Sequence, residues 1–126
     1  DLEGKPLGKP VYAGAIDAVG GDLLANIVAQ VQPYGNVAAI GLAGGPKLST
    51  TVMPFILRGV SLLGIHSVEC PNTWREEIWG NLSGGQKPAH LDTIANQTVG
   101  LADVHGVCET IMAGENTGRT VVDIQA

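Results

Sequence analysis

Three segments of this sequence place glycine or small polar residues directly after a short apolar run, where a ligand could approach the main chain. They are Asp17–Gly21, Gly41–Gly45 and the His66-Ser67 pair. In open parallel sheets, ligands bind beyond the carboxyl ends of the strands, and glycine allows a flat or phosphorylated ligand to come close to the backbone. The pattern therefore favours ligand contact at these three ends, although glycines in such places also occur as simple turn residues.

Other residues that could carry chemistry form no recognisable catalytic or metal-binding pattern. The sequence contains no G-x-G-x-x-G, no G-x-x-x-x-G-K-[ST] and no G-x-S-x-G motif. His66 and Cys70 lie four residues apart, but they supply too few ligands for a regular metal site. Arg119, beside Gly118, could reach a phosphate or a carboxylate, or could form a surface salt bridge. We therefore expect neither catalytic residues nor metal ligands in this chain.

Hydrophobic periodicity predicts the elements that position these ends. Strands are predicted at 11–17, 36–41, 60–67 and 93–98, and a turn into a closing strand at 116–124. Helical stripes predict helices at 22–32, 51–58, 71–82 and 101–113, with a linker at 83–88. Trp74, Ile78 and Leu82 are expected to face inward. Alternation of strands and helices predicts an α/β fold with a parallel sheet and right-handed crossovers.

The composition and charge of the chain exclude some classes of protein and favour others. The 126 residues suffice for one domain with a core. A net charge of −5 argues against a nucleic-acid partner, and the apolar runs are too short for a bilayer span. Two cysteines and an opening segment without an apolar signal sequence predict a cytoplasmic protein with reduced thiols. Since the chain lacks an initiator Met, a processed chain or a fragment is expected.

The glycine-rich segments resemble a known superfamily. Ala13–Gly21, Val37–Gly45, the Thr50–Arg58 run and Leu63–Val68 are similar to the zinc-independent medium-chain dehydrogenases/reductases. More narrowly, they resemble the quinone-oxidoreductase-like branch that includes acrylyl-CoA reductases. Gly118–Val122 is similar to the closing strand of that family.

The resemblance covers only the carboxyl-terminal part of the family pattern. It implies a partial Rossmann fold (three-layer αβα) in which residues 1–88 form the second half of a cofactor-binding domain. Residues 89–126 would then be a β-α-β tail that in the family returns to a GroES-like catalytic domain. The phosphate-binding loop and the catalytic domain of the family have no counterpart in this sequence.

The resemblance also implies an NADPH site. The Asp17–Gly20 loop would line the nicotinamide ribose, the Gly41–Gly44 loop and Ile65–Ser67 would lie near the nicotinamide ring, and the tail would bring Arg119 close to the cofactor. The expected cofactor-binding residues are Val19, Gly20, Gly41, Leu42, Ala43, Gly44, Ile65, Ser67 and Arg119. The family branch often has an acidic residue where this chain has His66, so no role is transferred to that side chain.

The implied activity of the parent protein is hydride transfer from NADPH to an enoyl thioester such as acrylyl-CoA, or to a quinone. The family further implies a homodimer through strand 60–66, whereas this chain alone is expected to be inactive. The choice between NADPH and NADH stays open, because the loop that reads the 2′-phosphate is missing. Two alternatives also stay open: a non-catalytic half-Rossmann binding or oligomerisation module, and an unrelated small α/β ligand-binding domain.

Overall fold

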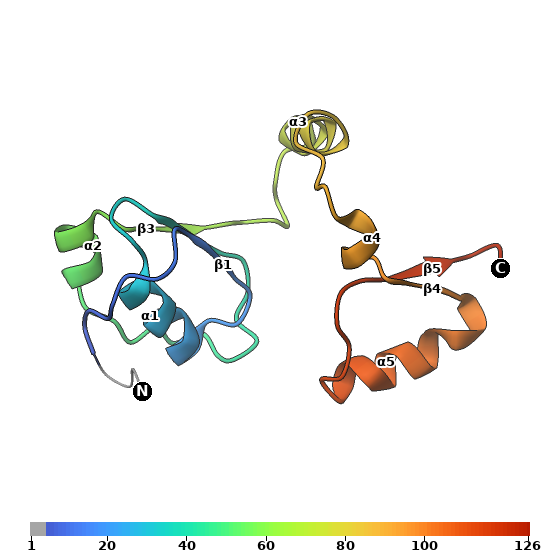
Figure 1. The fold of residues 1–126 in the computed structure, drawn as a ribbon, viewed down its shortest axis with the longest axis horizontal. Coiled ribbons are helices and arrows are strands. Elements are labelled where there is room, and N and C mark those ends of the chain that lie inside the picture. Colours follow the sequence, from blue (N-terminus) through green and yellow to red (C-terminus); the bar gives the residue numbers. More distant parts are fainter. Residues whose placement is uncertain (1–4) are drawn as a thin grey trace. The chain divides into compact units, whose positions relative to one another are not determined.

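The chain folds into two compact units, each with its own parallel sheet (Figure 1). The computed structural model describes residues 5–126. The first unit ends at Pro71, and the second unit spans Asn72–Ala126. The expected division at residue 88 into a cofactor-binding part and a tail remains a prediction.

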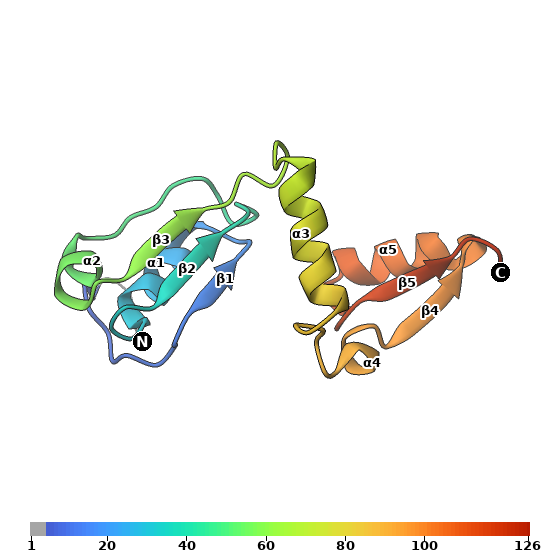
Figure 2. The same ribbon diagram turned by 90° about the horizontal axis from the view of Figure 1, so that it is seen from above.

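The first unit is a β-α-β-α-β arrangement. Its elements are β1 (Ala15–Asp17), α1 (Gly21–Gln30), β2 (Asn36–Ala39), α2 (Met53–Arg58) and β3 (Ser61–Gly64). The three strands are parallel in the order β1-β2-β3, so β2 is central and the carboxyl ends lie at one edge (Figure 2). The predicted α/β fold with a parallel sheet is confirmed. The first strand is shorter than the expected 11–17, since Tyr12 forms only an isolated bridge with Val31.

The core of the first unit lies on one face of the sheet. Five buried residues form it, namely Leu24, Val28, Val31, Val37 and Val60. Side chains alternate between faces along a strand, and the register places Ile16, Ala38 and Leu63 side by side on the opposite face. Ile16 is 77% exposed and Leu63 is 47% exposed. Right-handed crossovers place α1 and α2 on the same side, which explains why only one face is covered within this unit.

Glycine and proline residues lie at three helix termini between these strands. Helix α1 follows Gly20, whose φ of 71° places it in the left-handed region that glycine tolerates. Helix α2 carries Pro54 in its first turn and ends at Gly59 in the left-handed conformation, a common helix C-terminus. Glycine thus precedes the start of α1, and proline and glycine mark the start and the end of α2.

The second unit contains the predicted β-α-β tail. It consists of α3 (Asn72–Ser83), α4 (Leu91–Ile94), β4 (Gln97–Gly100), the short 3-10 helix η1 (Leu101–Asp103), α5 (Val104–Met112) and β5 (Thr120–Asp123). Strands β4 and β5 pair in parallel, with Val99 opposite Val122. A cross-strand pair of β-branched residues is favourable in a sheet.

Two sequence-based expectations are wrong in the second unit. The strand expected at 93–98 is divided: Ile94 ends the helical turn of α4, where its N–H donates to the His90 carbonyl (3.1 Å), and the strand starts only at Gln97. The expected inward stripe of α3 is also largely exposed: Trp74 is 62% and Ile78 53% accessible, and only Leu82 is half-buried. A helical stripe shows that a helix has an apolar side, but it does not show that another element covers that side.

Candidate functional site

The loops that follow β1 and β2 are joined by main-chain hydrogen bonds beyond the ends of the strands. The Asp17 carbonyl accepts from Ile40 N–H (2.8 Å), the Ala18 carbonyl from Ala43 N–H (3.2 Å) and the Val19 carbonyl from Gly44 N–H (2.7 Å). Two of the predicted glycine-rich ends, residues 17–20 and 41–44, are thus brought together at the carboxyl edge of the sheet. This is the edge at which parallel α/β sheets bind ligands.

Glycine is required where these two loops touch. A Cβ on Gly41 would lie 2.6 Å from the Ala18 carbonyl oxygen, and a Cβ on Gly20 would lie 2.7 Å from the Gly45 carbonyl oxygen. Such separations are too short for any real side chain, so the backbones could approach this closely only without one. The glycines therefore hold the loops against each other, whether or not they also admit a ligand.

A shallow groove of about 470 Å³ lies beside the joined loops. Its lining residues lie at and just beyond the ends of β2 and β3 and comprise Ala39, Ile40, Gly41, Leu42, Gly64, Ile65 and His66. Ile65 N–H donates to the Ala39 carbonyl (3.0 Å), which continues the β2–β3 pairing into the groove. Small residues and aliphatic side chains offer main-chain groups and a flat apolar surface, which suit a planar ring.

One titratable side chain lines the groove. His66 Nε2 lies 3.4 Å from Glu69 Oε2, and both side chains are largely exposed. An exposed pair of this kind contributes little to stability. Ser67, the other polar residue predicted at this end, donates its N–H to the Ile65 carbonyl (3.1 Å).

The Asp17 carboxylate also belongs to this site, although Asp17 is not among the predicted cofactor-binding residues. The residue is 2% exposed, and its Oδ2 accepts a hydrogen bond from Gly20 N–H at 2.8 Å. Its Oδ1 is buried and has no hydrogen-bond partner among residues 5–126. The signal available in the sequence was an acidic residue ending an apolar strand, three positions before a glycine.

Arg119 lies in the second unit, whereas the other predicted cofactor-binding residues lie in the first unit. Its N–H donates to the Ile94 carbonyl at 2.6 Å, directly before β5. Gly118, which precedes it, has a φ of 83°. The approach of the Arg119 side chain to a cofactor therefore remains a prediction.

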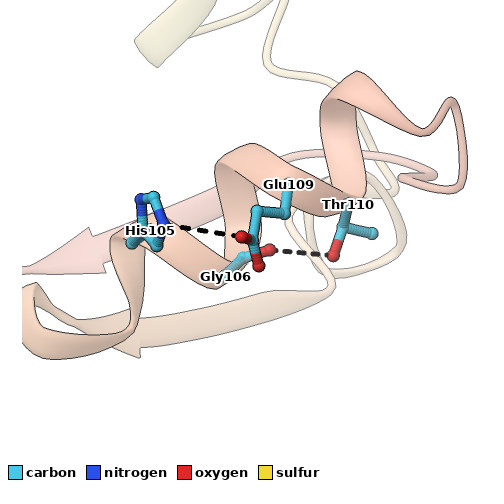
Figure 3. A network of polar contacts seen from close by, with 4 residues as sticks. All are labelled: His105, Gly106, Glu109 and Thr110. Atoms are coloured by element: carbon cyan, nitrogen blue, oxygen red, sulfur yellow. Dashed lines mark hydrogen bonds and ion pairs between the residues drawn. The ribbon is translucent and has the colours of Figure 1, made fainter.

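Polar contacts on α5 have the character of surface interactions. His105 Nε2 lies 3.5 Å from Glu109 Oε1, and Thr110 Oγ1 donates to the Gly106 carbonyl at 3.0 Å (Figure 3). Both contacts join residues four apart on one exposed helix, which is the usual spacing for helix-surface pairs.

Among the described residues, no group of three or more potential metal ligands comes together, and no helix combines the length and the apolar character needed to cross a bilayer.

Comparison with known proteins identifies relatives along nearly the whole chain. No family model matches the sequence. The chain is 43% identical over 120 residues to the Bacillus subtilis (strain 168) protein named "Putative quinone oxidoreductase YhfP", covering 95% of this chain and 36% of that protein. It is 41% identical over 122 residues to the acrylyl-CoA reductase AcuI of Ruegeria pomeroyi, covering 97% and 37% respectively.

Solved structures of such relatives share the fold. The Escherichia coli K-12 protein YhdH with bound NADPH superimposes with a TM-score of 0.81 at 44% identity, covering 98% of this chain and 38% of that protein. The Bacillus subtilis YhfP structure, with NAD bound, gives a TM-score of 0.83 at 43% identity, covering 95% and 36%. The chain thus spans a little over a third of the length of these relatives.

Proposed function

We propose that this chain forms the nicotinamide-binding part of an NADPH-dependent oxidoreductase. The proposal follows from its relation to the quinone oxidoreductase-like and acrylyl-CoA reductase proteins, which confirms the resemblance noted in its sequence. The observation that carries the proposal is the groove between the ends of β2 and β3, beside two glycine loops joined by hydrogen bonds. A nucleotide bound there would meet main-chain groups at close range.

The proposed reaction of the whole protein is hydride transfer to an activated carbon–carbon double bond. The acceptor is an enoyl thioester such as acrylyl-CoA, or a quinone. The dihydronicotinamide supplies the hydride, and the protein binds and orients it. In this proposal Val19 and Gly20 lie along the ribose, while Gly41–Gly44, Ile65 and Ser67 lie beside the ring. Arg119 contacts the cofactor from the second unit.

A second copy of the chain is the proposed partner at the free edge of β3. In the strand order β1-β2-β3, β3 has a neighbour on one side only. Unpaired main-chain groups on an edge strand readily pair with another chain. The proposal places a homodimer contact along residues 60–66.

We also propose that the protein is cytosolic, where the free thiols of Cys70 and Cys108 would stay reduced.

Calorimetric titration of the chain with NADPH tests the cofactor proposal. We expect weak, saturable binding that requires the nicotinamide, so that ADP-ribose, which lacks this ring, binds less well. Gly41→Ala should abolish binding by forcing the loops apart, whereas Gly80→Ala, whose Cβ would meet no atom within 4 Å, should leave it unchanged. Equal binding of NADPH and ADP-ribose would contradict a nicotinamide site. Absence of binding, together with self-association, would favour the oligomerisation module.

A further inference from the structure

We propose that the buried carboxylate of Asp17 positions the glycine loop of the nucleotide site by holding the Gly20 main chain. This inference rests on the proposed function and deepens it, since it adds a positioning residue to a site otherwise built from main-chain groups and small residues. The relationship that carries it is the 2.8 Å hydrogen bond from Gly20 N–H to Asp17 Oδ2.

The hydrogen bond acts at the point where the loop is most constrained. Gly20 has φ 71° and ψ −155°, a conformation open to glycine alone. Its carbonyl accepts from Leu24 N–H (3.2 Å), which starts α1, and a Cβ on Gly20 would lie only 2.7 Å from the Gly45 carbonyl oxygen. By fixing Gly20, Asp17 therefore fixes both the start of α1 and the contact between the two glycine loops.

The burial of Asp17 indicates that stability alone does not explain the residue. A buried carboxylate is unfavourable unless its oxygens are hydrogen-bonded, and Oδ1 has no partner in the part of the chain that the structure describes. The start of α1 lowers this penalty, because the helix N-terminus carries a partial positive charge. An asparagine could accept the same Gly20 hydrogen bond without burying a charge.

The position of the carboxylate also affects what can bind. Anions favour helix N-termini, but the start of α1 already has the Asp17 carboxylate beside it. This negative charge disfavours a phosphate at this loop. It suits the uncharged or cationic end of a nicotinamide nucleotide better.

Three variants of the chain separate the hydrogen bond from the charge. Asp17→Ala removes both the acceptor and the charge, and Asp17→Asn keeps an acceptor for Gly20. Asp22→Asn is the matched control, because it removes an exposed charge from the first turn of α1 without touching Gly20. The readouts are hydrogen exchange of the Gly20 amide, with the Val28 amide as an internal reference, and the dissociation constant for NADPH measured below the unfolding transition.

We expect Asp17→Ala to speed exchange at Gly20 and to weaken NADPH binding about tenfold, the effect of losing one hydrogen bond to a charged group. Asp17→Asn should restore exchange and binding to within about twofold of the original, and Asp22→Asn should change neither. An Asp17→Ala variant that is less stable but keeps the original affinity would overturn the inference, because a purely structural role predicts that result.

Two further results keep the inference separable from the proposed function. If the unmodified chain binds no nicotinamide nucleotide, the proposed function fails, while slow exchange at Gly20 that is lost in Asp17→Ala would still support positioning of the loop. If Asp17→Ala does not fold, the scalar coupling across the hydrogen bond between the Gly20 nitrogen and the Asp17 carboxylate carbon decides the question in the unmodified chain. Presence of this coupling supports the inference, and its absence overturns it.

Discussion

The Gly44 N–H donates to the Val19 carbonyl at 2.7 Å, so that the loops following β1 and β2 are paired beyond the strands that they extend. The pairing uses main-chain groups to bring residues 25 positions apart in sequence together at one edge of the sheet. The geometry of the site therefore depends on having glycine at the positions where the two loops touch.

Gly41 offers a direct test of this dependence. We expect Gly41→Ala to lower the free energy of unfolding by about 1–3 kcal/mol, because its Cβ would lie 2.6 Å from the Ala18 carbonyl oxygen. Gly64→Ala, in the same sheet but with no atom within 4 Å of the new Cβ, should change it by less than about 0.5 kcal/mol. Urea unfolding of both variants measures the difference, and equal stabilities would contradict the close loop contact.

Arg58 connects three parts of the first unit through its guanidinium group. Nη1 donates to the carbonyls of Ala29 (3.0 Å) and Val31 (3.3 Å), at the end of α1, and Nη2 donates to the Gly8 carbonyl (2.6 Å). We expect Arg58→Met to lower the free energy of unfolding by about 1.5–3 kcal/mol.

Arg58→Lys should recover less than half of that loss, because a single ammonium cannot reproduce the planar arrangement of donors. Lys47→Met, on an exposed loop, is the matched control and should have little effect. Denaturant unfolding monitored by circular dichroism provides the measurement. A lysine variant as stable as the original would show that charge alone, and not the fork of donors, holds these carbonyls.

The free edge of β3 predicts self-association. Ser61 and Ile65 donate their N–H groups toward the β2 side, to the carbonyls of Gly35 and Ala39. Donors alternate along a paired strand, so the Gly64 N–H points toward the open edge. Gly64→Pro should therefore shift the sedimentation of the chain from dimer to monomer, whereas Gly64→Ala should not. A monomeric unmodified chain at high micromolar concentration would rule out the β3 dimer.

The exposed His66–Glu69 pair should contribute little to stability. We expect Glu69→Gln to change the free energy of unfolding by less than about 0.5 kcal/mol, because both partners stay solvated and the attraction is screened by salt. Thermal unfolding at low and high ionic strength measures this effect. A loss above 1.5 kcal/mol would show that the pair is held more firmly than its exposure indicates.

The alternation of strands and helices could be predicted from the sequence, because each element carries its own periodicity. The apolar runs around Val37 and Leu62 and the stripe through Leu24 and Val28 are local signals, and the structure contains the corresponding elements. The meeting of the glycine loops at one edge followed from parallel topology. The β4 boundary was missed, because Ile94 fits a helical turn as well as a strand.

The burial of Asp17 and the exposure of the apolar side of α3 could not be predicted from the periodicity of the sequence. Nothing in the spacing of Asp17 and Gly20 reveals that the carboxylate is buried, since burial depends on how other parts of the chain pack around it. Similarly, the stripe through Trp74 and Ile78 predicts an apolar side of α3 but not what covers it. Both are properties of packing between elements.

The most direct test of the central claim is a titration of the isotope-labelled chain with NADPH, followed by the shift of each backbone amide. If the carboxyl edge of the β1-β2-β3 sheet binds the nicotinamide end, the largest shifts will fall on Val19–Gly20, Gly41–Gly44 and Ile65–Ser67, and ADP-ribose will not reproduce them. Shifts concentrated elsewhere in the chain, or identical shifts with ADP-ribose, would contradict a nicotinamide site at this edge.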